Sequence, residues 1–389
     1  MDRTESVDSF KEEYRSYTMR RIALIVVFSV ITVLLFFFSL TVGTRSLSMS
    51  EVYGYFLDYF KGITYDQSTQ YALWYDYRIV WNYRVPRALF AILAGAALSV
   101  AGAAMQNVMK NPLADPYTTG ISSGALLGVA VAMVAGLTVG SGSAYGTGAA
   151  INAMIFAMIP VAVIYLMSPY FRSPATLILA GTAISYLFSS LTSILLVSTD
   201  EETLASVYQW QVGTFSDVSW DSIPLVLIAC VVGVSILMFL SGKLNLMTLD
   251  DNNAKALGLN VERLRLVCLI VLSFMTAAVI SFVGVVGFVG LIIPHMVRLL
   301  IGSDNRFVIP ASVFVGATFL LACDIISRAI DVSATIPVGV VTAFIGSPIF
   351  LYLIIRNRRG IWRWPRSSSG RGSRRTAPGG AGGPSGCSC

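Results

Sequence analysis

Long apolar runs separated by short polar stretches make up most of this 389-residue chain. The runs are about 20 residues long, which is the length that an α-helix needs to cross a hydrocarbon core of about 30 Å. Glycine, proline and charged residues mark their boundaries. We therefore expect ten membrane-spanning helices, near residues 22–42, 88–108, 119–136, 148–168, 175–198, 222–241, 265–284, 288–301, 309–330 and 337–355.

Composition supports a membrane protein, because 55% of the residues are hydrophobic and only 12% are charged. A soluble globular chain carries about 25% charged residues. The predicted fold class is an all-α polytopic membrane protein. Five helices precede the acidic loop 199–221 and five follow it. An odd number of helices in each half is the arrangement of a repeat that is inverted in the membrane.

Three regions follow from the pattern. Residues 1–19 form a polar N-terminal segment, residues 20–357 hold the ten helices, and residues 358–389 are rich in Gly, Ser, Pro and Arg. We expect this tail to be disordered, with Trp362 and Trp364 at the headgroup level. No removable signal peptide is evident, because the first apolar run is too long for one and lacks a small-residue cleavage site.

Lysine and arginine in short loops predict the orientation. With both termini in the cytoplasm, the loops that carry Lys110, Arg172 and Arg298 all lie inside, whereas the acidic loop lies outside. The loop 43–87 breaks the rule, because it would place arginines outside. Cations on the disfavoured side are candidates for a functional role, although the rule is statistical; these are Arg78, Arg84 and Arg87.

Several kinds of chemistry are excluded. The sequence has no G-x-x-x-x-G-K-[ST] phosphate loop, so we do not expect the chain to hydrolyse nucleotide by itself. His295 is the single histidine, and the five cysteines are widely spread, which argues against a bound metal. Much of the +6 net charge follows Ile355, which indicates a membrane flank and no nucleic-acid site. An enzyme is not expected.

Charges inside the membrane are few. Asp324 and Arg328 lie one helical turn apart, where they would form an i, i+4 ion pair. A gradient-driven secondary transporter remains an alternative, but we expect such a protein to keep more polar groups in the membrane. A non-transporting scaffold would not need the many small residues that permit close helix packing, namely Gly95, Gly102, Gly124, Gly128, Gly287 and Gly290.

The most informative polar loop is residues 246–265. Its first part, Asp250 to Leu257, favours a short helix, Gly258 is a typical C-cap, and a second helix is expected from about Val261. Such a two-helix projection could dock into a groove on a partner protein. An ordinary connector fits the same pattern.

The loop A-K-A-L-G-L-N-V-E-R-L-R (254–265) resembles the coupling loop of the FecCD family of ABC-importer permeases, which handle iron-siderophores, haem and cobalamin. Other blocks resemble the family in order and spacing. They are R-V-P-R-A-L-F-A-I-L-A-G-A-A-L (84–98), G-A-A-M-Q-N-V-M-K-N-P-L-A-D-P (102–116), G-I-S-S-G-A-L-L-G (120–128), L-I-L-A-G-T-A-I-S (177–185), V-G-F-V-G-L-I-I-P-H-M-V-R (286–298) and P-V-G-V-V-T-A-F-I-G-S-P-I-F (337–350).

The resemblance implies a homodimer in the cell membrane, with the path for a metal-chelate substrate at the interface. It also implies two partner ATPase subunits, which would hold ATP and magnesium, and an extracytoplasmic substrate-binding protein. This chain would bind no cofactor. By family position, the coupling residues are Ala254, Lys255, Ala256, Leu257, Gly258 and Glu262, the docking arginines are Arg84, Arg87 and Arg328, and the path residues are Gly181, Thr182 and Ser185.

The resemblance has two departures. Thr335 stands where the family usually has a glutamate, and the tail after Gly360 has no family counterpart. A docking role also offers a second orientation for Arg328, pointing out toward the binding protein instead of pairing with Asp324. The choice among siderophore, haem, cobalamin and an oxyanion is not encoded in these motifs.

Overall fold

The computed structural model describes residues 3–45, 47–139, 143–167, 174–330 and 336–356. These residues form helices and no strand. Within them, eight helices are long and apolar enough to cross a membrane, and α5 (Ile121–Ala135) and α13 (Val289–Ile301) are shorter apolar helices. The long ones contain α1 (Arg3–Ser39), α4 (Val85–Val108), α6 (Thr147–Met167), α7 (Pro174–Val197), α9 (Ile223–Phe239), α12 (Val261–Val283), α14 (Asn305–Ile330) and α15 (Val338–Arg356). These ten helices match the ten that the sequence predicts.

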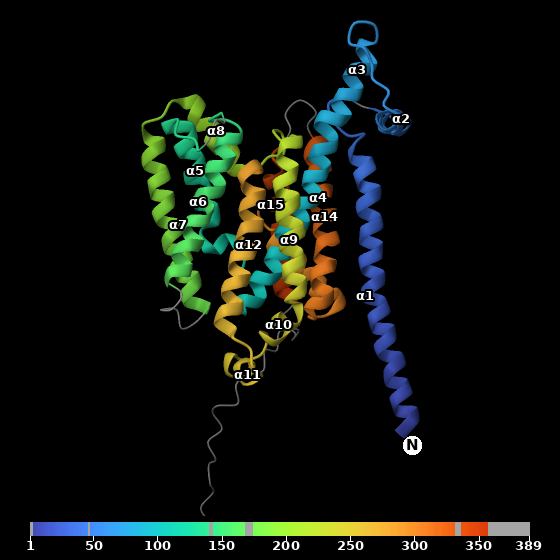
Figure 1. Ribbon diagram of the computed structural model, residues 1–389, viewed down its shortest axis with the longest axis vertical. Helices are drawn as coiled ribbons and strands as arrows, with labels where there is room; N and C mark the ends of the chain where they lie inside the picture. The colour runs from blue at the N-terminus through green and yellow to red at the C-terminus, as the bar shows by residue number, and fades with distance from the viewer. Residues whose placement is uncertain (1–2, 46, 140–142, 168–173, 331–335, 357–389) are drawn as a thin grey trace, which may run out of the picture.

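Helix α4 is the centre of the bundle. It packs against α14, α12, α13 and α9, while α1 lies at the edge against α14 (Figure 1). Helices α5, α6 and α7 form a group on the opposite side. Because α4 is rich in alanine and glycine, its neighbours approach it closely from every direction.

Glycines make the closest helix contacts possible. A Cβ atom on Gly102 of α4 would overlap the backbone of Gly290 in α13, and one on Gly95 would overlap the backbone of Gly316 in α14. Gly124 and Gly128 of α5 meet the backbone of α6 in the same way. The predicted packing role is confirmed for these glycines and for Gly290. It is wrong for Gly287, which has open space beside its Cα.

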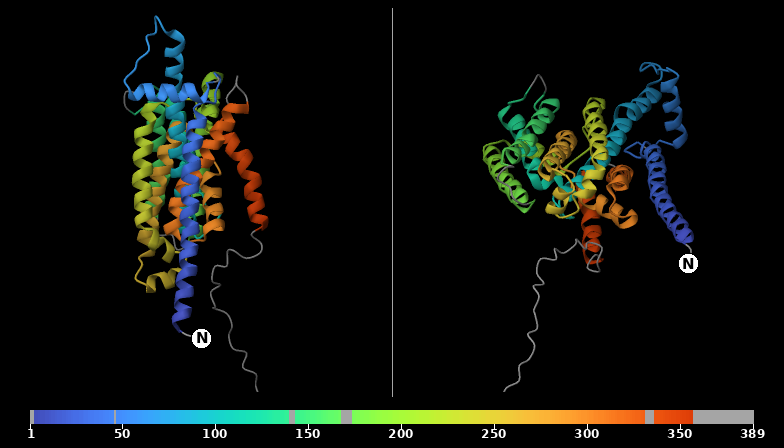
Figure 2. Two further views of the ribbon diagram at one scale, coloured as in Figure 1. Left: turned by 90° about the vertical axis from the view of Figure 1, so that its right-hand side faces the viewer. Right: turned by 60° about the horizontal axis from the view of Figure 1, so that its bottom comes forward.

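Short helices extend both ends of the bundle. At the end away from the N-terminus, which we name the α2 end, lie α2 (Met49–Phe60), α3 (Tyr71–Arg78) and α8 (Glu201–Val212) (Figures 1 and 2). At the other end, the α11 end, lie α10 (Ser241–Leu246) and α11 (Asp251–Ala256). Hydropathy does not reveal α2, α3 and α8, because they are too short or too polar to be read as spans. One-turn segments η2 (Pro116–Thr119) and η4 (Trp220–Ser222) precede α5 and α9.

Two spans begin more than ten residues earlier than predicted. The π-helical segment η1 (Ile79–Arg84) joins α3 to α4, so that one helix of 38 residues runs from Tyr71 to Val108. Pro86 at the start of α4 has no N–H to donate to the preceding turn, which favours a wider turn there. Likewise α1 begins at Arg3, and most of the polar segment 1–19 continues the first span as a helix.

Some predictions lie outside the described residues. They concern Arg172, Thr335, Trp362, Trp364 and the tail 358–389. The inverted repeat stays a prediction.

Candidate functional site

The loop 246–265 folds as the sequence predicts. Helix α11 ends at Ala256, Gly258 adopts the left-handed conformation that favours glycine (φ 84°), and α12 begins at Val261. Asn260 caps α12, since its side chain accepts a hydrogen bond of 3.0 Å from the Arg263 N–H. This two-helix projection, which we name the α11 knob (residues 250–262), extends beyond the neighbouring helix ends (Figure 1).

The surface of the α11 knob carries five of the six predicted coupling residues. Lys255, Ala256, Leu257, Gly258 and Glu262 are exposed, whereas Ala254 is fully buried beneath them. Lys255 and Glu262 form an ion pair of 2.6 Å, and the hydrogen bond from the lysine lowers the pKa of Glu262. Leu257 is 62% exposed at the tip. An apolar tip with a charged border is suited to a groove on another protein.

Asp251 attaches the α11 knob to the membrane helices. Its two carboxylate oxygens lie 2.5 Å from Lys110 Nζ and 3.4 Å from Arg265 Nη2, and we name these three residues the Asp251 cluster. Burial opposes ionisation of Asp251, but the hydrogen bond and charge of Lys110, with Arg265, outweigh it and lower the pKa of the carboxyl. Arg265 Nε also donates to the Val108 carbonyl at the end of α4, at 3.3 Å. The knob is therefore joined to both α4 and α12.

Polar contacts continue inward from the Asp251 cluster. Arg298 of α13 donates to Gln106 and to the Ala103 carbonyl of α4, the latter at 3.0 Å. Asn107 donates to Asn305 at the start of α14, at 2.7 Å. Four helices are thus cross-linked at the α11 end. His295 is buried on α13 near this network.

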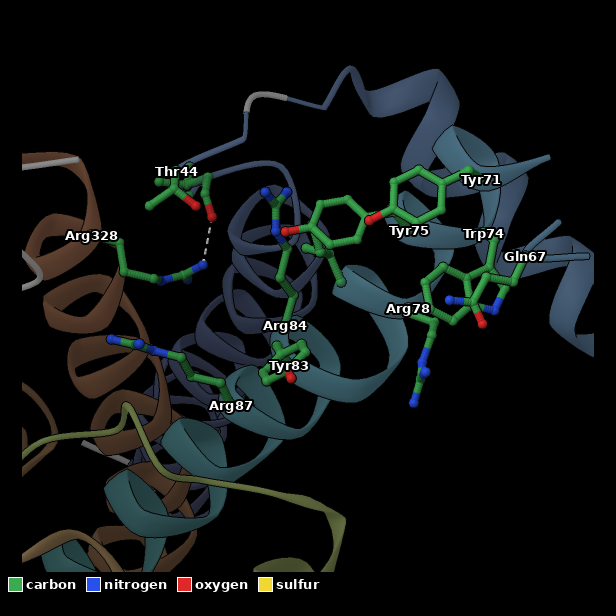
Figure 3. Close-up of a pocket in the computed structure, with 13 residues that line it drawn as sticks. Thr44, Gln67, Tyr71, Trp74, Tyr75, Arg78, Tyr83, Arg84, Arg87 and Arg328 are labelled. Atoms are coloured by element: carbon green, nitrogen blue, oxygen red, sulfur yellow. Dashed lines mark hydrogen bonds between the residues drawn. The ribbon is translucent and has the colours of Figure 1, made fainter. Parts of the chain in front are cut away.

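At the α2 end, Asp324 is the centre of a buried ion-pair triad. Its carboxylate is fully buried and lies 2.7 Å from Arg87 Nε and 2.8 Å from Arg328 Nη2. The predicted pair of Asp324 with Arg328 is confirmed. Arg328 also donates to the carbonyls of Ser39 and Val42, at 2.9 and 2.7 Å, the second of which Figure 3 shows as a dashed line. The outward orientation of Arg328 is not adopted in this structure.

Arg84 ties the end of α1 to η1. It donates to the Leu40 carbonyl at 2.6 Å and to the Arg45 carbonyl, and only 6% of it is exposed. Arg78, in contrast, is exposed beside Trp74. The docking role of Arg84, Arg87 and Arg328 stays a prediction.

These arginines border a cavity of about 590 Å³ at the α2 end. Aromatic side chains from α3 and η1 form much of its wall (Figure 3). The described lining contains four arginines and no carboxylate, and Asp324 pairs with two of these arginines. The cavity therefore has a net positive charge, which suits a carboxylate or phosphate group. Its lining includes Arg78, Arg84, Arg87, Arg328, Tyr71, Trp74, Tyr75 and Tyr83.

The predicted path residues on α7 face different ways. Gly181 is buried against the backbone of Thr118 in η2, so it allows α7 to pack closely there. Thr182 is exposed, and Ser185 is half-buried and donates to the Gly181 carbonyl at 2.8 Å. Of the three, Thr182 is therefore the one placed to face a path, and that role stays a prediction.

The sequence did not predict the long-range ion pairs within these sites. Lys110 and Asp251 lie 141 positions apart, and Arg87 and Asp324 lie 237 apart, so no local pattern reveals either pair. The signals available were the basic loop at Lys110 and the misplaced charge of Arg87. Among the residues that the structure describes, no group of three or more His, Cys, Asp and Glu could hold a metal ion.

The chain is similar to permease proteins along most of its length. It is 35% identical to an ABC transporter permease protein of Methanocaldococcus jannaschii, over 89% of this chain and 97% of that protein. The cobalamin import system permease protein of Halobacterium salinarum is 37% identical over 71% of this chain and 73% of its own length. The hemin transport system permease protein of Yersinia pestis is 32% identical over 76% and 87%, respectively.

A solved structure gives the same result. One that is described as an inward-facing conformation of a metal-chelate type ABC transporter superposes with a TM-score of 0.74 at 31% identity, over 86% of this chain and 99% of that one. The model of the FecCD transport family matches residues 31–356. The chain belongs to the FecCD transport family of ABC transporter permeases.

Proposed function

We propose that this chain is the membrane subunit of an ATP-driven importer for a metal chelate. Two copies would form the path, two separate ATPase subunits would dock on the α11 knobs in the cytoplasm, and a binding protein would deliver substrate at the α2 end. The observation that carries the proposal is the α11 knob itself. It exposes five of the six predicted coupling residues and is joined to the central helix α4 through the Asp251 cluster.

The contacts of the α11 knob with α4 and α12 would transmit its movement to the membrane helices. When the ATPases close, they would move α11, and Asp251 would carry that movement to Lys110 after α4 and to Arg265 on α12. Helices α4, α13 and α14 are cross-linked just inside this point, which favours a rigid-body switch between two packed states. The α11 knob would therefore act as a lever on the core.

The proposed substrate class rests on the relatives. Their names specify cobalamin and hemin, and the similar solved structure is of the metal-chelate type. We place the path along α7 at the interface of two copies, where Thr182 is exposed. The positive cavity at the α2 end would pair with acidic residues of the binding protein, which would govern the register and rate of docking more than the affinity.

A gradient-driven carrier is the weaker reading. Such a carrier needs a carboxylate in the membrane that can gain and lose a proton or bind a cation. Asp324 is instead held between two guanidinium groups, Arg87 and Arg328, which occupy its carboxylate oxygens.

Docking of the ATPase is testable at the tip of the α11 knob. We would co-express the chain with the ATPase subunit proposed as its partner and measure how much ATPase co-purifies. Leu257→Asp places a charge on the exposed tip and should abolish co-purification. Leu73→Asp, on the exposed side of α3 at the opposite end, is the matched control and should have no effect. Equal recovery with both variants would refute docking at the knob.

A further inference from the structure

Helix α2 lies crosswise at the end of the bundle, whereas the spanning helices run along it. Two views at right angles show α2 beside the end of α1 and across its direction (Figures 1 and 2). The start of α2 is fixed by a capping box between Ser48 and Glu51, and its end by Gly62, which has φ 69°. The structure thus holds a defined helix in the plane where a membrane surface would lie.

One side of α2 packs on the protein. Val52 and Tyr55 are buried, and the ring of Tyr59 stacks on Trp81 of η1 with centroids 3.9 Å apart. The Trp81 side chain donates to the Tyr55 carbonyl at 3.2 Å. These contacts fix the rotation of α2 about its own axis, so its remaining sides have definite directions.

A second side is apolar and uncovered. Met49, Tyr53, Phe56 and Phe60 follow the spacing i, i+4, i+7, i+11, which places them in one stripe. Three of them are exposed, Met49 by 53%, Tyr53 by 58% and Phe60 by 70%. The polar residues Ser50, Glu51 and Lys61 are exposed on a different side.

The apolar stripe continues the lipid-facing surface of α1. Phe56 meets Phe37 in the last turn of α1, with ring centroids 5.8 Å apart. Along α1, the large apolar side chains Val30, Val33 and Leu34 are exposed, as expected of a span that faces lipid. The stripe of α2 therefore begins where the lipid-facing side of α1 ends.

We propose that α2 is an interfacial helix that lies in the headgroup layer of the bilayer, with Met49, Tyr53 and Phe60 buried at the edge of the acyl chains. A helix with an apolar stripe and a charged opposite side binds membranes in this way, and tyrosine favours this depth. Since α2 stacks on Trp81, three residues before Arg84, the lipid surface sets the height of the positive cavity. Helix α2 would lie in this layer whichever substrate is carried and whether or not an ATPase is bound.

The test is the depth of spin labels in vesicles of phosphatidylcholine and phosphatidylglycerol that contain the full chain. Cys387 and Cys389 are first replaced by serine, and Cys230, Cys268 and Cys323 are buried. Labels are placed by Tyr53→Cys and Phe60→Cys, with Ser50→Cys as the control on the polar side. Collisions with oxygen report lipid, and collisions with a soluble nickel complex report water.

Labels at 53 and 60 should collide mainly with oxygen, and the label at 50 mainly with nickel. The proposal is overturned if the labels at 53 and 60 are as open to nickel as the one at 50. It is also overturned if the spectrum of the label at 53 or 60 is broadened by the same label on a second chain, because the stripe would then face a second copy. The proposal is likewise overturned if the labels at 53 and 60 collide with nickel in the chain alone and lose these collisions only when a binding protein is added. The stripe would then face that protein.

Discussion

Replacing Asp324 by asparagine should destabilise the chain strongly, because it leaves two guanidinium groups without their counter-charge. Asp324 is fully buried, and the side chains of Arg87 and Arg328 are only 13% and 6% exposed. Removing one partner from a buried pair costs about 3–5 kcal/mol. Arg328 keeps two carbonyl acceptors and the cavity admits water, so we expect the lower end, about 3 kcal/mol.

The assay is the free energy of unfolding in mixed detergent micelles, titrated with sodium dodecyl sulfate and followed by tryptophan fluorescence. Glu262→Gln is the matched control, because it removes the carboxylate of an exposed pair that contributes at most about 1 kcal/mol. Adding Arg87→Met to Asp324→Asn removes one unpaired charge and should restore part of the loss. A loss for Asp324→Asn no larger than that of the control would refute the buried triad.

Three further predictions concern coupling, packing and pH. Asp251→Asn should reduce ATP-driven transport about 2- to 30-fold while the ATPase still co-purifies. The control is Asp250→Asn, at the exposed neighbouring position, which should transport normally. An equal loss in both variants would remove Asp251 from the coupling route. Gly102→Ala should lower the free energy of unfolding by about 1–3 kcal/mol, because the added Cβ would overlap Gly290. Gly54→Ala is the control and should cost nothing, because there is open space beside Gly54. Equal costs would contradict the close contact. The folded-state pKa of Asp251 lies below its usual value of 3.8. Its contribution to stability is therefore complete above about pH 4 and is lost as the pH falls through the lowered value. Hydrogen exchange of the α11 amides, corrected for intrinsic rate, should show loosening of α11 below pH 4 and no loosening between pH 5 and 8.

Hydropathy was sufficient for the ten apolar helices, because each must satisfy its own backbone and present an apolar surface to lipid. The turn at Gly258 was equally readable, since a left-handed C-cap has a local signature. Helix α2 could not be predicted, because it is short, partly polar and stabilised by stacking on Trp81 in a distant segment. Its position depends on tertiary contacts that no local pattern contains.

The candidate site shows the same division. The exposed residues of the α11 knob were found from their own motif, which one continuous segment carries. The partner of Arg87 could not be predicted from the sequence, because Asp324 lies on another helix and only the packed bundle brings the two together. The spacing of Asp324 and Arg328 predicted a pair, but not that a third charge completes it.

The central claim is tested most directly by transport in vesicles. The chain would be reconstituted with the proposed partner ATPase and binding protein, with ATP on the α11 side. Uptake of labelled cobalamin, haem and a ferric siderophore would then be measured. We predict uptake of one of these chelates that requires hydrolysable ATP and disappears when the ATPase is omitted. Uptake by the chain alone, driven by a proton or sodium gradient, would contradict it.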